Sequence, residues 1–483
     1  MNSIPPSGSL HNSHPMRVGE AFNAAACASA ENANGARLIL QIPLHRLGAQ
    51  SSTIAANAAT PPVIQGGAEN RDALDQRATH RADELMHLAT DADIDVLALT
   101  GSEARSVLSR PNALPALREL RLTNCTDADL IDLAAMLKTV PHKPFALSFG
   151  RNKHVFISEQ GLAALGKVTF SSITLGGTSV YGNAARGLLN SASAVSILLP
   201  QARQHGETAL ASYLRIPTLT ALDARPRSCP HDIGLAIASH QSLKEFSIGD
   251  IDDSTLGEIA TSTTIQSLSC GRIMGLEEVA ALGSFADNTI LQSLRIACVA
   301  QPYALSALSR NKSLRFVSLG VSPDVRADFS ALANMSAVEM LSLRCVSAYN
   351  LRLQAKDVHA LCERPFKSLS LHNWDIHPAA QMLIAAAPLR HLLLNGPTPF
   401  SDAANYALSL NPTITSLSVG RATTTAANAI ILARSPTLQY FHAGFLTHFS
   451  ADEKAAITNA WHAAGKPLAN LELNQRFPLS VDR

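Results

Sequence analysis

The sequence predicts an α/β solenoid, in which parallel strands line a concave face and helices cover the convex face. The first observation is a short apolar phrase that returns along the chain. Ile414–Val419 (ITSLSV) is echoed by Leu438–Ala443 (LQYFHA), so that Phe441 follows Leu417 by 24 residues. The second observation is the intervening run TTTAANAIILARS, whose alanines and leucine favour helix. A strand and a helix that alternate at a constant period are typical of a solenoid repeat.

The phrase fits the template L-x-x-L-x-L-x-x-N/C, which is the strand segment of a leucine-rich repeat. We name its second apolar position the anchor. The sequence contains 16 anchors with a mean spacing of about 25 residues, inside the range of this repeat class. They are Leu97, Leu120, Leu147, Ile173, Ile197, Leu222, Phe246, Leu268, Leu294, Val317, Leu341, Leu369, Leu392, Leu417, Phe441 and Leu471.

The period has a physical reason. An anchor and the residue two positions later lie on the same side of a short strand. One repeat cannot bury this apolar side alone, but stacked repeats bury it against one another. We therefore expect Leu341 to pack between Val317 and Leu369. Segments with Ala and Leu at helical spacing complete the repeats. The clearest are 158–168, 255–263, 275–285, 357–365 and 451–461.

The residues before and after each anchor are expected on the concave face. Ser is frequent one position after the anchor and Gly three positions after it, which makes a smooth and weakly charged surface suited to protein contacts. Larger side chains gather in the C-terminal half, and aromatic residues, Met and Arg are common anchors of protein interfaces. The predicted partner-binding strip consists of Arg295, Phe316, Met340, Arg344, His372, His391, Asn395, Tyr440 and His442.

The composition argues against several classes of function. Lys and Arg number 39 and Asp and Glu number 38, whereas nucleic-acid-binding proteins usually carry a strong basic excess. No apolar stretch reaches the 18 residues of a membrane span. Seven scattered cysteines without a CxxC pair favour a reducing compartment. We expect no cofactor and no metal site, since the 17 histidines lack metal-ligand spacing. A monomer is expected.

The chain is expected to divide into three parts. Residues 1–70 are rich in Ser, Ala, Asn and Pro and are predicted to be disordered, because they cannot bury enough apolar surface to fold. Their Ser-rich, acid-poor start resembles a type III secretion signal. Residues 71–92 are predicted to form an N-terminal cap helix, and residues 93–483 to form about 16 leucine-rich repeats.

Catalytic motifs are missing from the sequence. GxxxxGK[ST], GxGxxG, GxSxG and HExxH do not occur. Cys125-Thr126-Asp127 is similar to the Cys-x-Asp of bacterial leucine-rich-repeat ubiquitin ligases. However, Cys125 occupies the N/C position of its own repeat, where a small buried side chain is expected. A ubiquitin ligase or another unrecognised enzyme is therefore the weakest alternative.

The phrases LSLNPTITSLSVG and LSRNKSLRFVSLG resemble the LAxNxTLxxLxLxxN phrase of GALA-type leucine-rich-repeat effectors of plant-pathogenic bacteria. ISEQGLAALGK resembles the helix segment of the same family. The resemblance covers about residues 95–475 and implies ribonuclease-inhibitor-like repeats. It also implies export by a type III system into the host cytoplasm or nucleus, and a host protein as the partner.

The same resemblance raises an alternative function. GALA-type effectors usually carry an F-box before the repeats, which would imply a Skp1-like adaptor as partner and ubiquitination of recruited proteins. Residues 82–108 resemble an F-box at Glu84, Leu85, Ile94, Leu97, Ala104 and Arg105. The stretch between Glu84 and Asp93 is several residues shorter than an F-box needs, and the usual Pro is missing. A cap helix followed by a first degenerate repeat, IDVLAL, is the interpretation that we favour.

Overall fold

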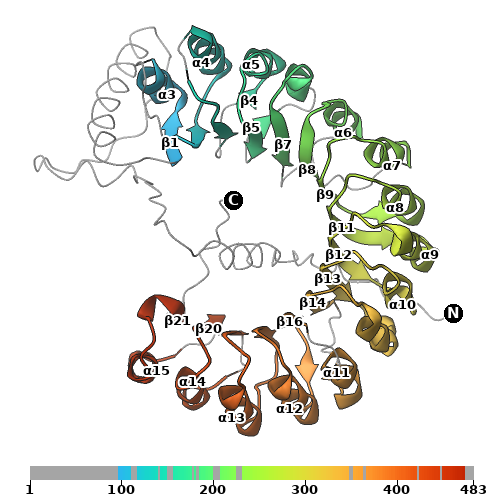
Figure 1. Ribbon diagram of the computed structural model, residues 1–483, viewed down its shortest axis with the longest axis vertical. Coiled ribbons are helices and arrows are strands. Elements are labelled where there is room, and N and C mark those ends of the chain that lie inside the picture. Colours follow the sequence, from blue (N-terminus) through green and yellow to red (C-terminus); the bar gives the residue numbers. More distant parts are fainter. Residues whose placement is uncertain are drawn as a thin grey trace, which may run out of the picture.

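Sixteen parallel strands line the concave side of a horseshoe in the computed structural model of the chain, and helices follow one another along its convex side (Figure 1). The structure describes residues 96–109, 117–139, 142–149, 156–176, 179–180, 184–199, 207–224, 231–346, 352–362, 366–420, 424–445 and 449–473. The expected tail 1–70 and cap helix 71–92 lie outside these residues.

The strands follow the predicted anchors. They are β1 (Val96–Thr100), β2 (Glu119–Thr123), β3 (Ala146–Phe149), β5 (Ser172–Gly176), β7 (Ala194–Leu199), β8 (Leu219–Ala224), β9 (Glu245–Ser247), β11 (Ser267–Met274), β12 (Ser293–Val299), β13 (Phe316–Val321), β14 (Met340–Cys345), β16 (Ser368–His372), β18 (His391–Asn395), β19 (Ser416–Gly420), β20 (Tyr440–Phe445) and β21 (Leu471–Leu473). The short β10 (Ile251–Asp252) adds to β11. Two small pairs, β4 (Phe156–Ile157) with β6 (Ser179–Val180) and β15 (Arg352–Leu353) with β17 (Asp375–Ile376), stand apart from the main sheet.

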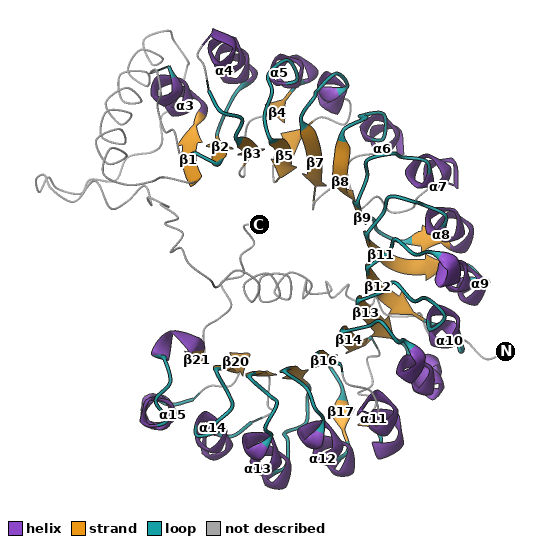
Figure 2. Cartoon of the chain, viewed as in Figure 1, coloured by secondary structure: helices purple, strands orange, loops and turns teal. Residues whose placement is uncertain are grey.

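Helices form the convex layer, as Figure 2 shows. They are α3 (Gly101–Leu108), α4 (Asp127–Thr139), α5 (Glu159–Leu165), α6 (Glu207–Tyr213), α7 (His231–Ala238), α8 (Asp253–Ala260), α9 (Glu278–Gly283), α10 (Ala304–Leu308), α11 (Ala355–Cys362), α12 (Pro378–Ala386), α13 (Asp402–Leu410), α14 (Ala426–Ala433) and α15 (Ala451–Ala463), with 3₁₀ helices η1 (Ala184–Leu188), η3 (Ser284–Asp287), η4 (Pro323–Asn334) and η5 (Leu468–Asn470). The five helical segments predicted from Ala and Leu spacing correspond to α5, α8, α9, α11 and α15.

The core is continuous along the stack. Leu341 is 1% exposed and lies opposite Val317 on one side and Leu369 on the other, as predicted. The residues two positions after the anchors are buried in the same way, for example Leu319 and Leu343. Because side chains alternate along a strand, each repeat contributes one apolar row to the core. The predicted α/β leucine-rich-repeat solenoid is therefore confirmed.

The predicted register is wrong at one anchor. Ile197 lies opposite Leu175, and it is Val195 that lies opposite the anchor Ile173. After a register shift between Val195 and Ser196, Ile197 then lies opposite the anchor Leu222 of β8. Val195 and Ile197 are both buried, so β7 presents one anchor to each neighbour. A two-residue slip keeps the same side chains on the same face, so the apolar pattern alone does not exclude it.

Asparagine side chains join successive repeats where a helix ends. The Nδ2 of Asn411 donates to the carbonyl oxygens of Ala385 (2.8 Å) and Ala387 (3.0 Å) in the preceding repeat. Its Oδ1 accepts from the backbone N–H groups of Thr413 and Ile414. The same arrangement occurs at Asn288 and Asn311. These bonds satisfy carbonyl groups that the helix ends leave without an intrahelical partner, which explains the Asn of the repeated phrase.

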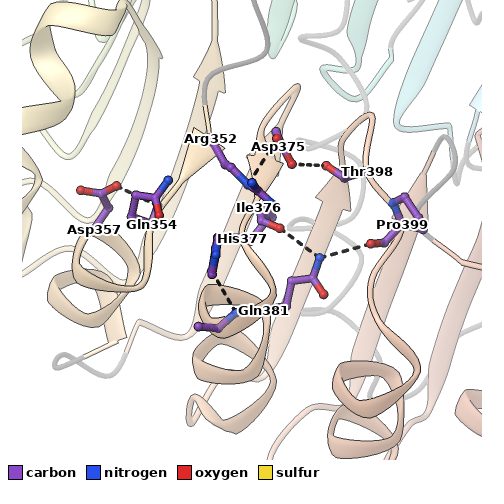
Figure 3. Close-up of polar contacts among 10 residues, drawn as sticks. Arg352, Gln354, Asp357, Asp375, Ile376, His377, Gln381, Thr398 and Pro399 are labelled. Carbon is purple, nitrogen blue, oxygen red and sulfur yellow. Dashed lines mark hydrogen bonds and ion pairs between the residues drawn. The ribbon is translucent and has the colours of Figure 1, made fainter.

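A second set of polar contacts ties repeats together beside β15 and β17 (Figure 3). Arg352 pairs with Asp375 at 3.5 Å, and Asp375 accepts a hydrogen bond from Thr398 at 2.6 Å. The buried Gln381 donates to the carbonyl oxygens of Ile376 and Pro399. These side chains are engaged with one another or with backbone, so they position loops and do not form a free site.

Candidate functional site

The three concave rows carry the candidate site. We define them as the residues one position before, one position after and three positions after each anchor. Their side chains alternate with the buried anchors in β2 and β5, whereas Ser342, Ser368 and Ser370 in β14 and β16 are themselves buried. The Ser and Gly residues of these rows that belong to described strands lie there as predicted. At Gly320 the small residue is needed, because a Cβ atom would overlap the carbonyl oxygen of Ala297 in the neighbouring strand.

The nine residues of the predicted strip lie in these rows between β12 and β20. Phe316 is directly opposite Met340 in the first row. Arg344, His372 and Asn395 occupy successive strands in the third row. The remaining members are Arg295, His391, Tyr440 and His442. The structure thus places all nine on one strand-lined surface, and we keep the name C-terminal strip for them.

One end of the C-terminal strip combines an aromatic ring with a cation. The guanidinium carbon of Arg295 lies 5.8 Å from the centroid of the Phe316 ring, within the range of a cation–π contact. Phe316 and Met340 are half-buried. The two side chains therefore offer an apolar surface with a charged edge, a combination common at the centre of protein interfaces.

The middle of the C-terminal strip holds Arg344 beside His372. Burial lowers the pKa of Arg344 from its very high ordinary value, and a guanidinium stays charged in proteins. Burial, and then the charge of Arg344, lowers the pKa of His372 to about 4, so this imidazole is neutral at pH 7. Its Nε2 lies 2.8 Å from the hydroxyl of Ser370, and its Nδ1 is buried without a hydrogen-bond partner.

The other end of the strip is more buried than the sequence suggests. His442 is 3% exposed, and its Nδ1 lies 2.9 Å from the hydroxyl of Ser418. Burial lowers the pKa of His442, and the charge of the adjacent Glu472 opposes this shift. Burial, together with the charge and hydrogen bond of Glu472, raises the pKa of Tyr440. His442 therefore lies beneath the concave surface, whereas the half-buried Tyr440 forms part of that surface.

The Ser–His contacts do not make a nucleophile. Ser370 is fully buried, so its hydroxyl is closed to a substrate in this structure. Cys125 is also fully buried, in the small polar position expected for its repeat. Among the residues that the structure describes, no group of His, Cys, Asp and Glu could hold a metal ion.

Charge divides the concave rows in a way that the sequence reasoning missed. The N-terminal rows carry the ion pair Glu119–Arg121 at 2.8 Å, followed by Asp223 and Glu245. From β11 to β20 the three rows contain Arg295 and Arg344 and no carboxylate; the next acid is Glu472 in β21. The signal was present in the sequence, since sorting charged residues by their distance from the anchor would have found it.

The F-box-like segment is described only in part. Glu84, Leu85 and Ile94 lie outside the described residues. Leu97 pairs with Leu120 in the main sheet and is 3% exposed, and Ala104 in α3 is fully buried. Arg105 forms an ion pair with Asp132 at 2.7 Å. Leu97 and Ala104 thus pack inside the first repeat, as expected for a degenerate repeat.

Among the described residues, no helix is both long and apolar enough to cross a bilayer.

Comparisons with known proteins give structural neighbours alone. No protein-family model and no curated protein matches the chain. A chain in the crystal structure of the yeast Rad7–Elc1 complex aligns with a TM-score of 0.41 and 15% identity, over 77% of this chain and 89% of that one. A chain in the crystal structure of a TLR13–ssRNA13 complex aligns with a TM-score of 0.38 and 16% identity, over 76% of this chain and 53% of that one. The Leptospira interrogans leucine-rich-repeat protein LIC12759 aligns with a TM-score of 0.36 and 13% identity, over 81% of this chain and 98% of that one. Similarity at this level concerns the repeat architecture and carries no argument about function.

Proposed function

We propose that the chain is a non-enzymatic protein-binding effector, exported by a type III secretion system, whose C-terminal strip binds a host protein. The observation that supports this most directly is the presence of Phe316, Met340 and Arg344 on adjacent strands, and of Tyr440 farther along the same sheet, on a concave surface that is rich in Ser and Gly. Large aromatic, thioether and guanidinium side chains bring most of the binding energy at protein interfaces. The rigid stack of repeats holds them in fixed positions without a partner.

The experiment uses proximity labelling in plant cells that express the full-length chain. A labelled host protein is a partner of the strip when its signal falls at least tenfold in the Phe316→Ala/Tyr440→Ala double variant. The matched control is Leu198→Ala/Glu245→Ala, which also removes one apolar and one polar side chain from the concave side, in the N-terminal half. Equal labelling by all three forms would place the binding site elsewhere on the molecule.

Export is the second part of the proposal. It rests on the Ser-rich, acid-poor composition of residues 1–70 and on the resemblance to GALA-type effectors. The full chain and a variant lacking residues 1–70 are expressed in a bacterium with a type III apparatus, and both culture media are assayed. Secretion of the full chain alone supports the proposal. Secretion of the truncated form by the same apparatus would contradict it.

The F-box alternative receives no support from the described residues, because Leu97 and Ala104 are buried within the first repeat. A pull-down with a host Skp1-like adaptor separates the two functions. Binding of the adaptor by the full chain, lost on deletion of residues 1–95, would favour the alternative.

A further inference from the structure

Arg344 is the residue of the C-terminal strip whose half-buried charge most clearly lacks a partner. It lies in the third concave row of β14, between Gly320 and His372 on the neighbouring strands. It is half-buried, and it makes no hydrogen bond or ion pair with any residue that the structure describes. Charged groups that leave water are normally paired, because an unpaired buried charge is costly.

The acid nearest to Arg344 along the chain is already engaged. Glu339, which precedes β14, accepts from Arg315 at 3.1 Å and from Lys367 at 2.7 Å. Both cations lower the pKa of Glu339, with Lys367 as the larger cause. This carboxylate therefore serves two partners at the start of the strand, five residues from Arg344.

The neighbours of Arg344 leave its charge uncompensated. From β11 to β20 the concave rows hold no carboxylate. His372 is neutral at pH 7, so it neither repels an anion nor replaces one as the counterion of Arg344. The buried Nδ1 of His372 is a second polar atom without a partner at the same place. The hydrogen-bonding role of that nitrogen depends on the tautomer of the ring, so it is the unpaired guanidinium of Arg344 that points to a missing acceptor at this position.

Resting on the proposed function, we propose that Arg344 pairs with the carboxylate of an Asp or Glu side chain in an extended segment of the partner protein. The segment continues along β14 toward Met340 and places an apolar side chain against Met340 and Phe316. Arg344 lies four positions after Met340, which is about 13 Å along a strand. A bound extended segment would thus carry its acidic and apolar residues about four positions apart.

The near-zero net charge of the chain favours a polypeptide over a nucleic acid as the source of the negative charge. Nucleic-acid recognition draws on several cations that neutralise successive phosphates, whereas the rows from β11 to β20 contain Arg295 and Arg344 as their charged residues. One guanidinium forms a strong, bidentate contact with one carboxylate, which matches a single acidic side chain.

A displayed library of random linear 12-residue peptides tests the proposal without knowledge of the natural partner. The library is selected on the full-length chain, on Arg344→Gln and on Arg315→Gln. The Arg315 variant is the matched control, because it removes the same charge one repeat away, from a guanidinium that already has Glu339 as its partner. Peptides selected on the wild-type chain are expected to be enriched at least threefold in Asp and Glu. This enrichment should persist on Arg315→Gln and disappear on Arg344→Gln.

One selected peptide and its analogue with Glu replaced by Gln then complete a double-mutant cycle, read by fluorescence anisotropy. On the wild-type chain the replacement should weaken binding at least tenfold, and on Arg344→Gln it should change binding less than twofold. Thermal unfolding of each variant checks that the fold is intact. Arg344→Lys should restore part of the preference, since it returns the charge without the planar fork.

Several results would overturn the inference. One is that the selected peptides show no acidic enrichment, or that no peptide is selected at all. Another is that the enrichment is unchanged on Arg344→Gln. A third is that binding of a labelled single-stranded RNA depends on Arg344 whereas peptide binding does not. The proposed function fails separately. If host-protein labelling depends on Phe316 and Tyr440 but not on Arg344, the strip binds a protein and the carboxylate assignment is wrong.

Discussion

The Nε2 of His240 lies 3.1 Å from the carbonyl oxygen of Ile216, in the position that asparagine holds elsewhere in the solenoid. The Nδ1 of His240 accepts from the backbone N–H groups of Ser242 and Leu243. The ring therefore carries its proton on Nε2 and copies the pattern of Asn311, which bonds the preceding repeat and its own downstream backbone. A second proton on Nδ1 would face two donors, so this position requires a neutral ring.

This relationship predicts a pH dependence of stability. Burial lowers the pKa of His240, although its bond to Ile216 opposes the shift. Below its ordinary pKa of about 6.5 the unfolded chain binds a proton that the folded chain resists. The free energy of unfolding should therefore fall as the pH drops from 7.5 to 5. His372, whose pKa is about 4, and His391 and His442, whose pKa values burial also lowers, act in the same direction.

His240→Asn tests this contribution, because asparagine keeps both hydrogen-bonding roles and does not titrate. At pH 7.5 the variant should lie within about 1 kcal/mol of the wild-type chain. Its loss of stability between pH 7.5 and 5, measured by urea unfolding, should be smaller. His462→Asn, at an exposed histidine of α15, is measured in parallel as the matched control for the substitution. Identical slopes for His240→Asn and the wild-type chain would rule out this role.

A second prediction concerns the core. Leu341→Asp places a carboxylate between Val317 and Leu369, in a stack that excludes water. Because no partner for the charge faces it there, the variant should lose about 3–5 kcal/mol of stability. Leu341→Met, which conserves the volume, should lose less than about 1.5 kcal/mol. A melting temperature of Leu341→Asp within a degree or two of the wild-type value would mean that the register is incorrect.

The sequence was sufficient to locate the repeats because the physics of the stack is local and periodic. Each anchor must be apolar at a fixed pitch, so Leu341 could be placed between its neighbours by counting. Ile197 was misplaced because a two-residue slip leaves Val195 and Ile197 on the same buried face. Periodicity fixes the face of a side chain, but it does not fix the register within that face.

The positions of the candidate site residues were predictable to a similar extent. Alternation along the strand placed all nine strip residues on the concave side. Whether a side chain there is accessible depends on its neighbours in other repeats, and the burial of His442 beneath the surface follows from Ser418 and its surroundings. The unpaired state of Arg344 is likewise a property of three strands and the engagement of Glu339, which no single repeat reveals.

A third prediction follows from the cost of leaving Arg344 unpaired. Arg344→Met removes a half-buried charge and keeps the apolar stem, so the variant should be more stable than the wild-type chain by about 1 kcal/mol. Arg315→Met, which removes a largely exposed guanidinium, should change stability by no more than about 0.5 kcal/mol. Chemical unfolding measures both. If Arg344→Met instead lowered the free energy of unfolding by more than 1 kcal/mol, Arg344 would stabilise the fold and its charge would not be an unpaired ligand-binding group.

The last prediction concerns the two aromatic residues of the C-terminal strip. Phe316→Ala and Tyr440→Ala should each weaken binding of the partner by about 1–3 kcal/mol, because large aromatic side chains at an interface centre contribute energies of this size. Both side chains are half-buried in the free protein, so each substitution should also lower stability, by about 1 kcal/mol. Binding is measured at a temperature well below the unfolding transition, so the two effects are separated.

Phe316→Leu keeps an apolar side chain beside Met340 and should recover part of the affinity, whereas Tyr440→Phe tests the hydroxyl that interacts with Glu472. If the Phe316→Ala/Tyr440→Ala double variant binds the partner as tightly as the wild-type chain, the site does not lie on the C-terminal strip, because no other Phe, Tyr or Trp occupies the concave rows from β11 to β20.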